Sequence, residues 1–219
     1  MGNIVDDIRA NEDTFADRPF NEVDSLALAQ LSYARMPVNV PRLDAEAMDV
    51  DLAMVGVRDL LRAECYDDMF GKVWSPSMNV DLLRAMCESP RWRDLRVGGY
   101  VDEFDPETTK QFSACVFDVG DGSSYVAFRG TDSTIVGWKE DFAMAFRRPV
   151  AAQESAARYL ADIAGRRDGP LMVGGHSKGG NLAVYAAANA PAAVQERLIA
   201  VCCHDGPGFD ADFFDTPGY

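Results

Sequence analysis

A short apolar segment runs directly into a glycine-rich stretch and then into an alanine-rich one, and this order strongly constrains the fold. Residues 171–173, Leu-Met-Val, predict a buried strand, and residues 181–189 predict a helix. Between them, residues 174–180 read Gly-Gly-His-Ser-Lys-Gly-Gly and contain a G-x-S-x-G pattern with Ser177 at its centre. A glycine-rich turn that joins a buried strand to a helix indicates an α/β protein.

The rest of the chain extends this prediction. Strands after residue 123 alternate with helices, which predicts a mainly parallel sheet with crossover helices. We expect a helical N-terminal region over residues 1–90, packed on an α/β core over residues 91–219. Strands are predicted at 95–104, 111–119, 123–128 and 198–203, a hairpin turn at 120–122, and helices at 21–33, 44–65, 79–88, 138–146 and 151–165.

Ser177 is the first candidate for chemistry. A serine on such a turn has a strained backbone, and glycines at 175 and 179 allow the strand and helix to approach closely. The turn aims the backbone N–H of Lys178, at the helix start, toward the position of an oxyanion. The alternatives are a purely structural glycine turn and a phosphate-binding loop, whose G-x-x-x-x-G-K-[ST] spacing the sequence does not match.

A second motif precedes the serine. Residues 128–133 read Phe-Arg-Gly-Thr-Asp-Ser, and Trp138 and Asp141 follow them. A strand that ends in a tight glycine turn can supply a second oxyanion donor, and the backbone N–H of Thr131 is placed to do so. The alternative interpretation of this motif is a hairpin end followed by a helix cap.

Together these motifs resemble the class 3 lipases of the α/β hydrolase fold. Residues 19–33 and the segment His-Asp-Gly-Pro-Gly-Phe at 204–209 more narrowly resemble a bacterial family of uncharacterised hydrolases related to those lipases. The resemblance implies that Ser177 is a nucleophile and that Thr131 and Lys178 form the oxyanion hole. It also implies a lipid or other hydrophobic acyl ester as the substrate, in an ester or thioester hydrolysis without a cofactor.

The acid and base of such an enzyme are the missing parts. In this fold they follow the serine in the order acid, then histidine. His176 is expected to be structural, while His204 and Asp205 are substitute candidates for base and acid. The resemblance places the acid and base beyond residue 219, so we expect this chain to be catalytically incomplete. The alternatives are a non-catalytic binding module on a hydrolase scaffold and a phosphoryl-transfer protein that uses the glycine loop.

Composition restricts the partners. The formal net charge is −14, which opposes general binding to nucleic acid or to anionic membranes. No apolar stretch reaches about 18 residues, so no transmembrane helix is expected, while peripheral membrane contact stays open. The start of the chain lacks the features of a secretory signal, and the cysteines suit neither zinc nor a disulfide framework, so reduced thiols in a cytoplasm are expected. The cysteines are Cys65, Cys87, Cys115, Cys202 and Cys203.

Two sets of basic side chains have open interpretations. The Lys178 side chain is expected in solvent near the helix start, with attraction of an anionic acyl group as the alternative. Arg91, Arg93 and Arg96 are expected on the exposed face of a strand, with an anion site as the alternative.

Overall fold

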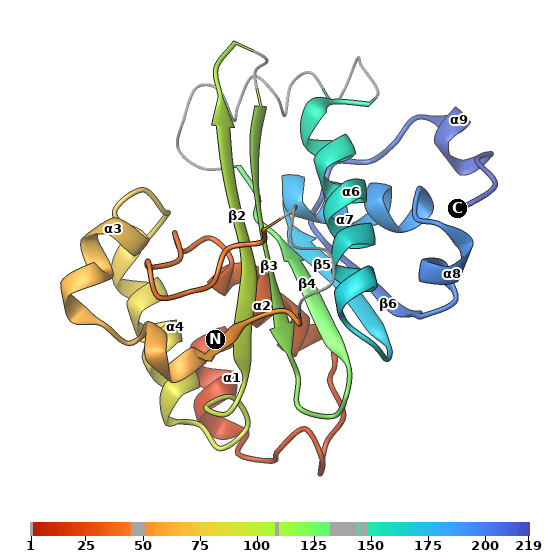
Figure 1. Ribbon diagram of the computed structural model, residues 1–219. Helices are drawn as coiled ribbons and strands as arrows, with labels where there is room; N and C mark the ends of the chain where they lie inside the picture. The colour runs from red at the N-terminus through yellow and green to blue at the C-terminus, as the bar shows by residue number, and fades with distance from the viewer. Residues whose placement is uncertain (1, 45–50, 108–109, 132–143, 145–148) are drawn as a thin grey trace.

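The computed structural model describes residues 2–44, 51–107, 110–131, 144 and 149–219 (Figure 1). The strands are β1 (Met54–Gly56), β2 (Arg96–Asp105), β3 (Lys110–Asp118), β4 (Ser124–Phe128), β5 (Leu171–His176) and β6 (Leu198–His204). The helices are α1 (Ile4–Ala10), α2 (Glu22–Leu31), α3 (Tyr66–Phe70), α4 (Pro76–Glu88), α6 (Ala151–Arg166), α7 (Lys178–Ala188), α8 (Ala192–Gln195) and α9 (Ala211–Phe214), with the 3-10 turns η1 (Val57–Leu60) and η2 (Ala63–Cys65).

The six described strands form one mixed sheet in the order β1-β2-β3-β4-β5-β6. The pairs from β1 to β4 are antiparallel, and only β4–β5 and β5–β6 are parallel. The α/β class is therefore confirmed, but the prediction of a mainly parallel sheet is wrong. The reason is connectivity, because only four residues separate β2 from β3 and five separate β3 from β4, and so short a connection makes neighbouring strands antiparallel. Helical crossovers, which make neighbours parallel, begin only after β4.

Helices cover both faces of the sheet. Figure 1 shows α6 and α7 on one face and α2 on the other, with α1 and α4 beside α2. A hydrophobic core lies on each face of the sheet, and β3 contributes to both. Cys115 and Phe117 pack on the side of α2, whereas Ala114 and Val116 pack on the side of α6 and α7. This alternation follows from the period of two along a strand.

Most predicted elements are present within a few residues, but the predicted helix over 44–65 is wrong wherever the structure describes it. Residues 54–56 instead form β1, paired with β2 at the sheet edge, and η1 and η2 follow. Pairing with an available strand edge outweighed the local helical pattern. The predicted helix over 138–146 falls, apart from Met144, outside the described residues, as do Asp132, Ser133, Trp138 and Asp141.

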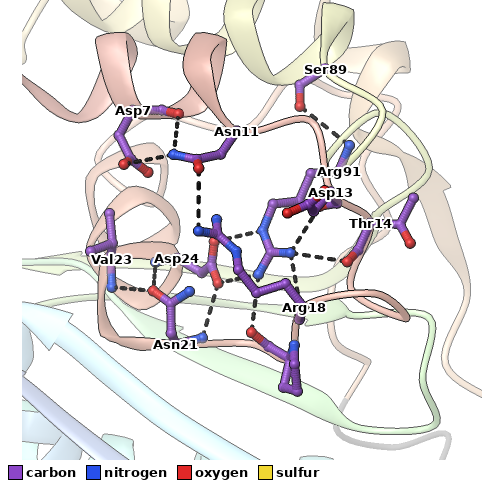
Figure 2. A network of polar contacts seen from close by, with 11 residues as sticks. Asp7, Asn11, Asp13, Thr14, Arg18, Asn21, Val23, Asp24, Ser89 and Arg91 are labelled. Atoms are coloured by element: carbon purple, nitrogen blue, oxygen red, sulfur yellow. Dashed lines mark hydrogen bonds and ion pairs between the residues drawn. The ribbon is translucent and has the colours of Figure 1, made fainter.

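Arg91 is buried rather than exposed, which corrects the expectation for this arginine. Its side chain is 1 % exposed, and it forms an ion pair with Asp24, whose Oδ1 accepts from Nε at 2.9 Å. The guanidinium also lies 4.0 Å from the centroid of the Phe15 ring. Four backbone carbonyls accept its remaining N–H groups (Figure 2), those of Asp13, Thr14, Arg18 and Pro19. We call Arg91, Asp24 and residues 13–19 the Arg91 cluster.

The position of Arg91 explains the error. Residues 90–94 form turns that precede β2, so the alternation of a strand does not apply to them. Arg93 is close to the expectation, with a side chain that is 47 % exposed. The Arg91 cluster holds the segment that leads into α2, and Asn21 caps that helix with Asp24 in a capping box. It therefore fixes the N-terminal segment under the sheet.

Candidate active site

Ser177 occupies the turn between β5 and α7. Its backbone has φ 55° and ψ −129°, a conformation that residues with side chains rarely adopt. The Ser177 N–H donates to the His204 carbonyl at 2.8 Å, and the Ser177 carbonyl accepts from the Gly180 N–H at 2.9 Å. The end of β6 and the first turn of α7 therefore hold this strained, partly exposed residue from both sides. We call residues 175–179 the serine turn.

Two glycines allow β4, β5 and α7 to meet at the serine turn. A Cβ atom at Gly175 would lie 2.5 Å from the Phe128 carbonyl oxygen, and one at Gly179 would overlap that oxygen. No real side chain fits in that space, so the start of α7 lies directly against the end of β4. The close approach predicted for both glycines is present.

Thr131 comes to the same edge of the sheet. Phe128, the last residue of β4, pairs with Gly175 in the parallel register. Two residues later, a Cβ atom at Gly130 would lie 2.6 Å from the His176 carbonyl oxygen. Thr131 is the next residue and is partly exposed. The structure therefore brings the segment around Thr131 beside the serine turn.

Arg129 anchors this segment on its other side. Its N–H donates to the Ser113 carbonyl at 3.0 Å, and its side chain donates to Asp102 Oδ1 at 2.9 Å. Asp102 also forms an ion pair with Arg35, 3.5 Å from Arg35 Nε to Oδ2. Arg129 is buried, so the backbone directly after β4 is held in place.

The side chain of Lys178 is completely buried, so the expectation of a solvated lysine is wrong. Its relative exposure is 0 %, and its Nζ donates to the Gln111 carbonyl at 2.7 Å and to Gln111 Oε1 at 3.3 Å. The close contact of α7 with β4 explains the burial, because it leaves the first residue of the helix facing the sheet rather than solvent. Lys178 thus links the serine turn to the beginning of β3.

The two histidines lie side by side at the ends of β5 and β6, and hydroxyl groups from the N-terminal region contact both rings. His176 pairs with His204 in the strand register. Tyr33 OH lies 2.9 Å from His176 Nδ1, and Ser25 Oγ lies 2.8 Å from His204 Nε2. Ser25 Oγ also lies 2.7 Å from Tyr125 OH, whose pKa is raised by burial, so Tyr125 remains protonated. Helix α2 and the residues after it therefore take part in the site.

His204 and Asp205 are near Ser177 but do not form a visible relay with it. The His204 carbonyl contacts the Ser177 N–H, whereas its ring contacts Ser25. Burial lowers the pKa of the His204 imidazole below the usual 6.5, and the neighbouring His176 lowers it further. The neutral ring is therefore favoured near pH 7, as a general base requires. Asp205 is exposed and has φ 53°.

Three residues of this site were missed at the level of sequence: Ser25, Tyr33 and Gln111. Ser25 had a readable signal, because it is a small polar residue on the apolar face of an amphipathic helix and is 0 % exposed in the structure. Tyr33 lies two turns further along the same segment. Gln111 carried no signal, because its role depends on a lysine 67 residues away.

The described residues contain no group of three or more His, Cys, Asp or Glu side chains that could hold a metal ion. In the same part of the chain, no helix has both the length and the apolar character needed to cross a bilayer.

Comparison with known proteins identifies the family. A family model described as Mbeg1-like matches residues 86–219, more than half of the chain. The chain belongs to the Mbeg1-like family. The Mbeg1-like match includes Thr131, Ser177 and Lys178, but Ser25 and Tyr33 lie outside it. Searches of curated proteins and of solved structures found no match.

Proposed function

We propose that the chain is a serine hydrolase of ester or thioester bonds, with Ser177 as its nucleophile. The observation that carries the proposal is the backbone of Ser177, at φ 55° and ψ −129° between β5 and α7. Strain of this kind costs about 1–3 kcal/mol and persists mainly at functional sites. Membership of the Mbeg1-like family supports a lipase-like hydrolase as the general class.

The proposed reaction is acyl transfer to water. Ser177 Oγ attacks the substrate carbonyl carbon and gives its proton to a base, forming a tetrahedral oxyanion. The backbone N–H groups of Thr131 and Lys178 stabilise that oxyanion. The bond to the alcohol or thiol then breaks, the leaving group takes up a proton, and water hydrolyses the acyl-serine. The resemblance to class 3 lipases favours a hydrophobic acyl ester as the substrate.

The direct test is labelling of the full-length natural protein, with the acid and base that the resemblance implies, by a fluorophosphonate probe, followed by mass spectrometry of the intact protein and of its peptides. We expect one probe per chain, on Ser177, and no labelling in Ser177→Ala. Ser77→Ala is a matched control, because Ser77 lies exposed on α4. Turnover of p-nitrophenyl esters from acetate to laurate would then define the acyl chain length that the site prefers.

The identity of the base can be tested in the same assay. If His204 is the base, His204→Gln abolishes labelling. If His204→Gln is labelled at the wild-type rate, the base is another residue and His204 is structural.

A non-catalytic binding module on the same scaffold is the second candidate. One observation favours it: the rings of His176 and His204 contact Tyr33 and Ser25 rather than Ser177. An unlabelled Ser177 in a protein with a native circular dichroism spectrum and a cooperative unfolding transition would favour the binding module over the hydrolase.

A further inference from the structure

We propose that the buried ammonium of Lys178 positions the oxyanion hole, by tying the start of α7 to β3, the strand that runs beside the residues just before Thr131. This inference rests on the proposed hydrolase function. The hydrolase proposal uses only the backbone N–H of Lys178, whereas this inference gives a role to its side chain.

Burial of the Lys178 side chain is costly. Lys178 is 0 % exposed and Gln111 is 2 % exposed, so the ammonium lies in the protein interior. Lysine is almost never fully buried, because removing its charge from water costs several kcal/mol. A leucine or methionine would fill similar space without that cost. The retained lysine therefore points to a role other than filling the core.

The Lys178 ammonium reaches the strand that runs beside the residues before Thr131. The Arg129 N–H donates to the Ser113 carbonyl at 3.0 Å, so the antiparallel register of β3 and β4 continues beyond the end of β4. Gln111 lies two residues before Ser113 on β3, and Thr131 lies two residues after Arg129. The ammonium of Lys178 therefore connects one proposed oxyanion donor to the strand beside the other.

Backbone contacts of its two neighbours hold the main chain of Lys178 in place. The following residue, Gly179, lies against the Phe128 carbonyl oxygen, and the preceding residue, Ser177, is held by the end of β6. The Lys178 side chain adds a third attachment, to β3, at 2.7 Å and 3.3 Å from the two oxygens of Gln111. Together these contacts restrict the direction of the Lys178 N–H, as an oxyanion donor requires, since its distance from the oxyanion must stay near about 2.7–3.1 Å.

The test is the steady-state hydrolysis, by the full-length natural protein, of the p-nitrophenyl ester that the wild type prefers. We expect Lys178→Met to lower kcat by about 10- to 100-fold, because a displacement of about 1 Å in a catalytic group has an effect of this size. KM is expected to change little, since the oxyanion exists only in the transition state. Lys178→Arg keeps the cation and is expected to recover part of kcat. Lys72→Met, at an exposed lysine, is the matched control.

Gln111→Met is a second variant in case Lys178→Met does not fold. It removes the acceptor at 3.3 Å and leaves the backbone carbonyl at 2.7 Å, so a smaller loss of kcat is expected with the same KM. Thermal unfolding of each variant measures its folded fraction. A loss of activity that only follows the folded fraction would mean that Lys178 is merely structural.

The outcomes separate this inference from the function on which it rests. If wild-type Ser177 is not labelled by the fluorophosphonate, the hydrolase proposal fails and the role of Lys178 fails with it. If the wild type is labelled and Lys178→Met keeps the wild-type kcat, or changes only KM, the role of Lys178 alone is overturned. A lowered kcat with an unchanged KM and partial recovery in Lys178→Arg supports it.

Discussion

Arg91 lies under the N-terminal helices and Lys178 lies at the start of α7, and both cations are buried almost completely. The Arg91 guanidinium pairs with the Asp24 carboxylate, contacts four backbone carbonyls and stacks on Phe15. Lys178 instead reaches the two oxygens of Gln111, beside a strained turn. The first arrangement closes a segment of chain onto the core, whereas the second joins elements around Ser177.

Backbone strain also distinguishes the region around Ser177 from the Arg91 cluster. Three non-glycine residues of the described chain have positive φ: Ser75, Ser177 and Asp205. Ser177 and Asp205 directly follow β5 and β6, whose last residues pair with each other. None of the three belongs to the Arg91 cluster. The comparison indicates that the Arg91 cluster serves stability, while the ends of β5 and β6 store strain that a catalytic site can use.

The largest effect on stability is expected from Arg91→Met. This change leaves the Asp24 carboxylate buried without its cation, and breaking a buried ion pair in this way costs about 3–5 kcal/mol. Urea denaturation measures the loss in the free energy of unfolding. Arg93→Met is the control, because the Arg93 side chain is 47 % exposed. Equal effects of the two substitutions would contradict the structural role of the Arg91 cluster.

Ser25→Ala tests whether α2 belongs to the site region as well as to the N-terminal packing. The substitution removes a hydroxyl that contacts both His204 and Tyr125, at 2.8 Å and 2.7 Å. Tyr125 keeps its hydrogen bond to the Ser25 carbonyl at 3.2 Å, so the expected loss is that of the bonds to the hydroxyl, about 1 kcal/mol for each. Chemical denaturation of Ser25→Ala and of the exposed control Ser77→Ala measures the difference. A Ser25→Ala protein as stable as its control would argue against the contact with His204.

Ser177→Gly sharpens the comparison by changing stability in the opposite direction from Arg91→Met. Glycine adopts positive φ without strain, which recovers about 1–3 kcal/mol, but it loses about 0.5–1 kcal/mol of chain entropy. We expect a net gain of about 1 kcal/mol in the free energy of unfolding, with complete loss of fluorophosphonate labelling. Ser75→Gly, at φ 52°, should gain stability and keep labelling. Destabilisation by Ser177→Gly would mean that the turn is not strained.

The smallest effect is the pH dependence that His204 contributes. Its pKa is lowered in the folded protein from the usual 6.5, mainly by burial and further by His176. As the pH falls below about 6.5, the unfolded chain binds the proton first, so the free energy of unfolding decreases. The stabilisation that His204 contributes is fully present above about pH 6.5 and is lost as the pH falls below it. Denaturation of the wild type and of His204→Gln at pH 8 and pH 5.5 should show the shallower slope in the variant, and parallel slopes would contradict the lowered pKa.

Local patterns predicted much of the fold correctly. The β3–β4 hairpin, the helix α6 and the segment from β5 to α7 each have their signal within a few neighbouring residues. The close approach of strand and helix at Gly175 and Gly179 was predictable for the same reason, because a short motif indicates it. The segment 54–65 was not, since its strand β1 exists only through pairing with β2. The sheet was wrongly predicted to be mainly parallel, because the short connections β2–β3 and β3–β4 make antiparallel pairs and the helical crossovers come only later in the chain.

The sequence by itself therefore determined the strand, the turn and the helix around Ser177, because hydrophobic periodicity and glycine act over short distances. Only the tertiary structure decided the partners of the polar groups. Arg91 meets Asp24 across 67 positions, and Lys178 meets Gln111 across the same separation. His204 meets Ser25 across 179 positions. Such contacts depend on strand register and on which helix covers which face, and a buried polar group takes whichever partner that packing provides.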